Sequence, residues 1–226
     1  MFIFVFILFT VIGTISHEFG HIIAAESLGY DTSLHYGSMR YDNSELSNKL
    51  DVIYIENEHE IENNLPYEQK EAFERGMEKF KSDDFLILIG GPIQTILTGC
   101  IGLLILVIRR KKIKRNGLNT IDWLAVFLSL FWLREVFNLV HSIIYNIVFQ
   151  EGIYFGGDEM YISEYLGLSS GSLPIILGFI GLGVSCYVIF KIISKNIRST
   201  FILSGITGGI AGFLIWFEIL GPVLLP

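Results

Sequence analysis

The chain has 226 residues, of which 51% are hydrophobic and 17% are charged, and its formal net charge is −7. Soluble domains carry about 25% charged residues, so this composition predicts a membrane protein. The negative charge and the lack of a large basic face argue against nucleic acid as a partner.

Five stretches are apolar over about the 20 residues that a helix needs to cross a bilayer. No Lys or Arg precedes the first stretch and no small-residue cleavage site ends it, so we expect a retained helix rather than a signal peptide. The fold class expected is an all-α, multi-pass membrane protein with one domain, residues 1–226. The predicted helices cover Phe2–Leu28, Phe85–Ile108, Ile121–Phe149, Leu173–Ile193 and Phe201–Leu220.

One sizeable polar region, residues 29–84, lies between the first two predicted helices. It is expected to form a small α+β insertion outside the membrane. Ser33–Asp42 alternates apolar with polar residues and predicts a strand or hairpin. Leu50–Glu56 predicts a second strand. Tyr67–Phe80, directly after Pro66, predicts an amphipathic helix.

Basic residues cluster in two predicted loops. Residues 109–115 hold six positive charges, and residues 191–198 hold Lys191, Lys195 and Arg198. Positively charged loops are retained in the cytoplasm, so both loops are predicted to be cytoplasmic. Alternation then places the N-terminus inside and puts both the 29–84 region and the Gln150–Ser172 loop on the opposite side.

The first predicted helix contains an H-E-x-x-H sequence, His17 to His21. Residues four apart lie on one face of a helix, so His17 and His21 can present two imidazole nitrogens to one Zn²⁺. Glu18 lies beside that face and can take a proton from a water activated by the metal. Ionisable groups inside a membrane helix are costly unless paired or hydrated, and by default they mark function. The pattern therefore predicts one zinc ion per chain, with Glu18 as the catalytic acid and base.

A zinc site of this kind needs a third protein ligand and an open position for water. Asp158 follows two glycines that allow a sharp turn, and it lies on the same predicted side as the end of the first helix. Glu159, its neighbour, can substitute for it. Glu135 is an alternative ligand with Asn138 on the same helix face, although an ion pair with Arg134 also explains a carboxylate at that position.

With these motifs the chain resembles the site-2 protease family of intramembrane zinc metalloproteases. The resemblance rests on the histidine motif, on Gly90–Thr95 (GGPIQT) in the second predicted helix, and on the glycine-flanked Asp158. Thr95 stands where that family usually has asparagine, and Glu159 where it has glycine after the aspartate. The resemblance implies that His17, His21 and Asp158 bind zinc and that Glu18 is catalytic. It also implies a role in substrate binding or site shape for a further set, Gly91, Pro92, Gln94, Thr95 and Asn138.

The function expected is hydrolysis of peptide bonds in membrane proteins or peptides, within or near the lipid bilayer. The Ser33–Asp42 segment is a candidate edge for pairing with an extended substrate. Two alternatives stay open: a membrane zinc enzyme with Glu135 as third ligand, and a non-catalytic membrane protein that binds zinc or a partner. A homo-oligomer and a regulatory membrane partner also stay open.

Overall fold

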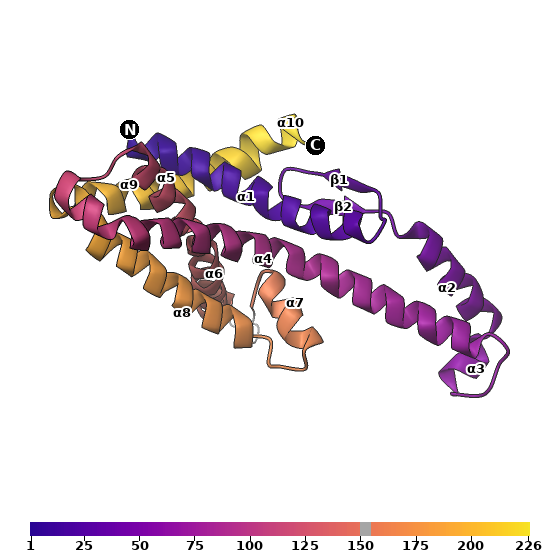
Figure 1. Ribbon diagram of the computed structural model, residues 1–226. Helices are drawn as coiled ribbons and strands as arrows, with labels where there is room; N and C mark the ends of the chain where they lie inside the picture. The colour runs from indigo at the N-terminus through magenta and orange to yellow at the C-terminus, as the bar shows by residue number, and fades with distance from the viewer. Residues whose placement is uncertain (150–154) are drawn as a thin grey trace.

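Helices dominate the computed structural model, which describes residues 1–149 and 155–226 (Figure 1). Five helical segments in this part of the chain are long and apolar enough to cross a membrane. The prediction of a helical chain with five such segments and a small extra sheet is therefore confirmed, while insertion into a membrane stays a prediction. The five segments are Phe2–Ser27, Lys70–Asn116, Thr120–Phe149, Ser172–Ile192 and Lys195–Leu224.

Three of the five segments are built from several helical pieces. The first two are single helices, α1 (Phe2–Ser27) and α4 (Lys70–Asn116). The third joins α5 (Thr120–Ser129), a 3₁₀ turn (Leu130–Trp132) and α6 (Leu133–Phe149). The fourth is α8 (Ser172–Tyr187) with a π-helical end, η2 (Val188–Ile192). The fifth is α9 (Lys195–Leu214), the π-helical η3 (Ile215–Leu220) and α10 (Gly221–Leu224).

The loop predicted over Gln150–Ser172 is only partly described. Its residues 150–154 lie outside the described part of the chain. The remainder contains a short helix, α7 (Asp158–Tyr165), which packs between α4 and α8. This helix matters because its first residue is the predicted third zinc ligand.

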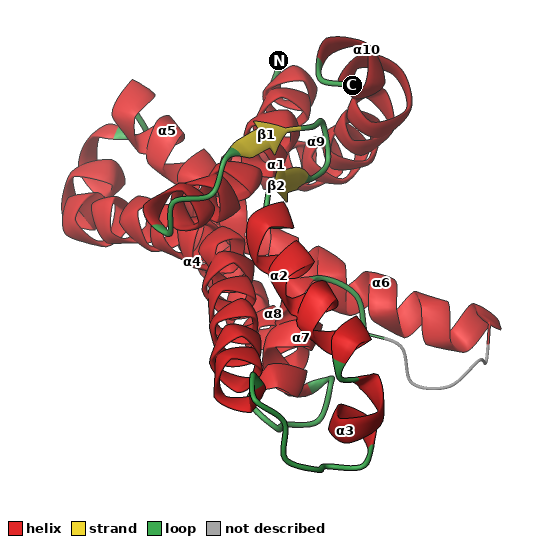
Figure 2. Ribbon diagram, turned by 90° about the vertical axis from the view of Figure 1, so that its right-hand side faces the viewer, coloured by secondary structure: helices red, strands yellow, loops and turns green. Residues whose placement is uncertain are grey.

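The polar region after α1 begins with the predicted hairpin. Strands β1 (Thr32–Leu34) and β2 (Met39–Tyr41) pair antiparallel with Leu34 opposite Met39, and Figure 2 shows them next to α1. The hairpin is tied to the last span, because the indole N–H of Trp216 donates to the Tyr36 carbonyl at 2.6 Å.

A second tie joins the end of α1 to α4. The Tyr30 hydroxyl donates to Asp83 Oδ2 at 2.6 Å. Burial, together with this hydrogen bond and the negative charge of Asp83, raises the pKa of Tyr30 to about 12. The phenol therefore keeps its proton, and the tie, over the physiological pH range.

The predicted strand Leu50–Glu56 is wrong. The segment belongs to a helix, α2 (Ser44–Glu56), followed by the short α3 (Glu58–Glu62). The helix buries Leu50 against Gly76 of α4, whereas Val52 and Ile55 stay exposed. A short apolar run is compatible with a strand or a helix, and here the contact with α4 favours the helix.

The predicted break between an amphipathic helix and the second membrane helix is also wrong. Residues 70–116 form one helix of 47 residues, about 70 Å long, because no proline interrupts the polar stretch before Phe85 and the helix continues through Gly76. Pro92 lies inside it, as membrane helices tolerate. The helix ends at Gly117, whose φ of 76° favours glycine. The basic residues 109–115 are thus the last turns of α4 rather than a loop.

The second basic segment, 191–198, is likewise mostly helical, with a link of two residues between η2 and α9. Both basic segments lie at the end of the molecule that holds the N-terminus, and the β1–β2 hairpin and α2 lie toward the other end (Figure 1). This arrangement follows the predicted alternation of the spans. The cytoplasmic location of the basic end remains a prediction.

The contact between α1 and α4 positions the first helix's histidines. Gly20 and Gly90 face each other so closely that a Cβ on either would collide with the carbonyl oxygen of the other. An aromatic cluster of Phe6, Phe127 and Phe201 packs α1 against α5 and α9 nearer the N-terminus. The polar half of α1 is therefore pressed against the middle of α4.

Candidate metal centre

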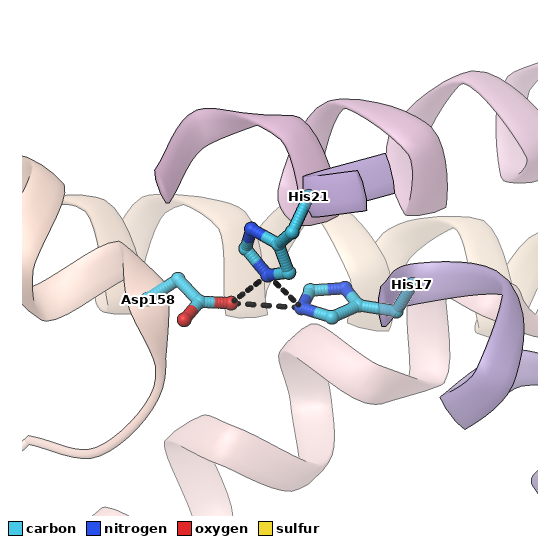
Figure 3. A group of neighbouring side chains, drawn as sticks. All are labelled: His17, His21 and Asp158. Carbon is cyan, nitrogen blue, oxygen red and sulfur yellow. Dashed lines mark hydrogen bonds and ion pairs between the residues drawn. The ribbon is translucent and has the colours of Figure 1, made fainter. Parts of the chain in front are cut away.

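Three side chains predicted to bind zinc lie together between α1 and α7 (Figure 3). Asp158 Oδ2 lies 2.8 Å from His17 Nε2 and 3.4 Å from His21 Nε2. The two Nε2 atoms are 3.2 Å apart. In the described part of the chain this is the one group of three or more His, Cys, Asp or Glu side chains with ligand atoms within 4.8 Å of one another.

Local backbone structure explains the convergence. His17 and His21 are one turn apart on α1 and so share a face. Asp158 is the first residue of α7, and Gly157 before it has a φ of 89°, a conformation that glycine adopts without strain. His17 is fully buried and His21 nearly so, while the Asp158 side chain is 24% exposed. The centre is therefore closed on the α1 side and accessible beside Asp158.

The far side of each imidazole is held by α4. His21 Nδ1 lies 2.8 Å from the Ile87 carbonyl oxygen, which can only accept, so Nδ1 carries the proton. The peptide N–H of Gly91 is farther from this nitrogen, at 3.4 Å, and the shorter contact sets the tautomer. His17 Nδ1 lies 2.9 Å from the Thr95 hydroxyl. His21 Nε2 therefore presents a lone pair to the centre, as a metal requires, whereas the Thr95 hydroxyl can donate to or accept from His17 Nδ1 and fits either tautomer of His17.

The spacing of the three acceptor atoms fits a metal ion. Zinc binds histidine nitrogen and carboxylate oxygen at about 2.0–2.2 Å in a tetrahedron, whose edges are then about 3.3 Å. The three separations, 2.8, 3.2 and 3.4 Å, bracket that edge. Two histidines and one carboxylate are a zinc donor set that leaves one position open. The residues present therefore fit a catalytic type of zinc site.

Arg134 of α6 supplies positive charge at the same place. Its Nη2 lies 3.0 Å from His17 Nε2 and 4.0 Å from Asp158 Oδ2. A guanidinium can only donate and needs a lone pair on His17 Nε2, whereas the Asp158 carboxylate, 2.8 Å from the same nitrogen, can only accept and needs a proton there. Sequence reasoning considered Arg134 as a partner of Glu135 and missed its approach to the histidine, which depends on how α6 packs.

The charge of Asp158 is itself favoured by its surroundings. Burial opposes the charged carboxylate, but hydrogen bonds from His17 and His21 when these rings carry a proton on Nε2, and the attraction of the protonated rings, outweigh burial and hold the pKa of Asp158 below its ordinary range. Asp158 is therefore ionised, as a metal ligand must be.

Glycine at position 91 leaves room for the centre. A Cβ at Gly91 would lie 2.5 Å from His17 Nε2 and nearer still to His21 Nε2. Pro92 is buried beside it within α4. The Gly-Pro element thus lies directly against the imidazoles, in agreement with a role in shaping the site.

Glu18 lies beside the histidines and outside the group of metal-binding atoms. Its side chain is buried and lies within electrostatic range of His21, Arg134 and Asp158. The backbone of Met39 in β2 also contacts its carboxylate. A carboxylate placed there can receive a proton without binding the metal.

The neighbouring polar residues of α4 contact protein groups. Thr95, expected to bind substrate or to shape the site, places its hydroxyl on His17. Gln94 donates to the hydroxyls of Ser16 and Thr98. These contacts hold α1 and its histidine against α4.

The alternative ligand Glu135 points elsewhere. It is buried near Glu159, and neither of its carboxyl oxygens has a hydrogen-bond partner among the described residues. Asn138 donates to Glu159 Oε2 at 3.2 Å. Glu135, Glu159 and Asn138 thus form a buried cluster behind Asp158, and none of them is in the group of metal-binding atoms.

Comparisons of the chain with protein-family models, with curated proteins and with solved structures gave no match. The likeness to site-2 proteases therefore rests on the sequence motifs, and membership of that family stays a hypothesis.

Proposed function

We propose that the protein is a membrane-embedded zinc metallopeptidase in which His17, His21 and Asp158 hold one zinc ion. The observation that carries the proposal is the spacing of three acceptor atoms, which matches the edges of a zinc tetrahedron. The orientation of both imidazoles by α4 supports it further. Five apolar helical segments support a location in the membrane.

Bound zinc would supply Lewis acidity, which polarises a carbonyl group and lowers the pKa of water. The chain's own residues do the rest. The Glu18 carboxylate accepts a proton from the attacking water at Oε and later donates it to the nitrogen of the leaving amine. The Ile87 carbonyl holds His21 in the tautomer that keeps its Nε2 free, and the Thr95 hydroxyl orients the His17 ring through Nδ1.

The substrate proposed is an extended segment of a membrane protein or membrane-bound peptide. A helix hides its carbonyl groups in hydrogen bonds, so the segment must unwind before it is cleaved. The β1–β2 hairpin supports this, because Met39 of β2 touches Glu18 and an adjacent strand edge can pair with an extended chain.

The test is zinc content together with peptide cleavage. Purified protein reconstituted in lipid should bind about one zinc per chain and cleave a library of fluorogenic membrane-anchored peptides. Glu18→Gln should keep the zinc and lose cleavage by at least about 100-fold, because general acid and base catalysis contributes that much. Cleavage by Glu18→Gln at the wild-type rate would refute the proposal.

A second candidate is a non-catalytic ionic cluster. It is favoured by Arg134, whose guanidinium already places positive charge 3.0 Å from His17 Nε2. In this case Arg134 and Asp158 would neutralise each other and no metal would be needed. The apoprotein would then fail to take up zinc at micromolar concentration, whereas the zinc peptidase would take it up.

A further inference from the structure

A basic groove lies at the opposite end of the protein from the β1–β2 hairpin. The end of α4 and the turn from η2 into α9 enclose a space of about 370 Å³. Arg110 and Lys114 line it from α4, and Lys191 and Lys195 line it from the other wall. Residues about 80 apart in sequence thus bring four cations to one groove, which we call the basic groove.

The four cations have no carboxylate partner in the described part of the chain. The one acidic residue in the sequence near either wall, Asp122, is bound by Arg109 at 2.5 Å. Arg198, which also lines the groove, donates instead to three backbone carbonyls at the end of η2, those of Ile189, Phe190 and Ile193. Like charges on facing walls repel, and an anion between them would remove that repulsion.

The groove lies where two apolar spans end. Ile108 precedes the basic turns of α4 and is 72% exposed, and Phe190 lines the groove and is 53% exposed. In a membrane these side chains would face acyl chains while the lysines and arginines reach the polar headgroups. The site therefore combines an apolar edge with a cationic pocket.

We propose that the basic groove binds the headgroup of an anionic phospholipid, with the phosphate between Arg110 and Lys114 on one wall and Lys191 and Lys195 on the other. Basic pockets between membrane helices at the cytoplasmic face are suited to such headgroups. A zwitterionic choline headgroup fits less well, because its ammonium would meet the same cations. This proposal is independent of the metal centre.

The chain offers a matched pair of variants. Arg110→Gln with Lys114→Gln removes two cations, four residues apart, from the groove. Lys111→Gln with Arg115→Gln removes the same two residue types at the same spacing from the same exposed turns of α4, but these residues do not line the groove. Lys191→Gln with Lys195→Gln tests the second wall.

Binding is measured on delipidated full-length protein in neutral detergent, by native mass spectrometry. The probes are phosphatidylglycerol and phosphatidylcholine with identical acyl chains, and inorganic phosphate. We expect preferential binding of phosphatidylglycerol, weakened about 10- to 30-fold by either groove pair and at most about threefold by the control pair. Unfolding temperature confirms that each variant folds.

Three results would overturn the proposal. Equal affinity for phosphatidylglycerol and phosphatidylcholine would show that the groove does not select an anionic headgroup. If the groove pair and the control pair weakened phosphatidylglycerol binding equally, the binding would depend on the general surface charge of α4 and not on the groove. Displacement of phosphatidylglycerol by an equal concentration of inorganic phosphate would assign the groove to a free ion rather than a lipid.

Discussion

His17 Nε2 lies 3.2 Å from His21 Nε2, and the proton of His21 is held on the far side of its ring by the Ile87 carbonyl of α4. The His21 lone pair and the Asp158 carboxylate both face His17 Nε2, so either a proton on that nitrogen or a cation between the three groups satisfies them. A bound zinc ion or the Arg134 guanidinium is the cation that the residues here can hold.

Removal of each proposed ligand should abolish zinc binding. His17→Ala, His21→Ala and Asp158→Ala each leave two ligands, too few for a stable protein site. Zinc content after dialysis, measured by mass spectrometry, is expected to fall from about one per chain to background. Glu135→Ala serves as the contrast, and loss of zinc in that variant with retention in Asp158→Ala would reverse the assignment.

Thr95 should control zinc affinity without binding zinc. Thr95→Val removes the hydroxyl on His17 Nδ1, and such changes behind a ligand weaken metal binding about 10- to 100-fold. Competition with a zinc chelator measures the affinity. Thr98→Val, which removes a hydroxyl one turn away that contacts Gln94, should leave it nearly unchanged. Equal effects of the two changes would contradict an orienting role for Thr95.

A methyl group at position 91 should block the metal centre. In Gly91→Ala the Cβ would collide with both Nε2 atoms, and both rings are held on their far sides, so the donor atoms must separate. The affinity for zinc should fall at least about 100-fold, which is more than we expect for Thr95→Val, where only a hydrogen bond to a ligand is lost. Gly183→Ala, in open surroundings on α8, is the control for helix glycine substitution. Wild-type zinc affinity in Gly91→Ala would show that the rings do not occupy this arrangement.

Arg134 should compete with zinc. Arg134 Nη2 lies 3.0 Å from His17 Nε2, and repulsion between one positive charge and a divalent ion about 4 Å away costs about 2 kcal/mol even at the dielectric constant of water, so Arg134→Gln should tighten zinc binding about 30-fold. Arg134→Lys keeps the charge and should bind zinc more nearly as wild type does. Isothermal titration of the apoprotein gives both constants. Weaker zinc binding by Arg134→Gln would contradict this prediction and indicate that Arg134 holds Asp158 in position to bind zinc.

The ion pair of Asp122 and Arg109 should stabilise the α4–α5 corner. Asp122 is 1% exposed, accepts from the partly exposed Arg109 and completes a capping box with Asn119 at the start of α5. Asp122→Ala removes these hydrogen bonds while Arg109 keeps access to water, so it should lower the free energy of unfolding by about 1–3 kcal/mol. Denaturation in detergent measures it. Asp51→Ala, an exposed change on α2, is the control and should have little effect.

Local patterns were sufficient for much of the site. The spacing of His17 and His21 sets them on one helix face whatever the fold, and the two glycines before Asp158 allow the turn that starts α7. Apolar runs long enough to cross a bilayer located the five spans. These features depend on few residues close in sequence.

The misassigned elements depend on packing between distant segments. Leu50–Glu56 forms a helix because Leu50 meets Gly76, a contact that its own apolar pattern does not contain. The roles of Thr95 and Arg134 arise from contacts with His17 across more than 70 residues. Sequence spacing cannot supply such contacts, because they follow from how α1, α4 and α6 are arranged.

The unbroken length of α4 has a mechanical consequence. This one helix touches α2 near its start, holds both imidazoles at its middle through Ile87 and Thr95, and carries one wall of the basic groove at its end. A helix of about 70 Å that tilts by about 10° about its middle shifts its two ends by about 6 Å in opposite directions. Such a tilt would couple displacements at α2 to displacements at the basic groove, with the candidate metal centre near the pivot.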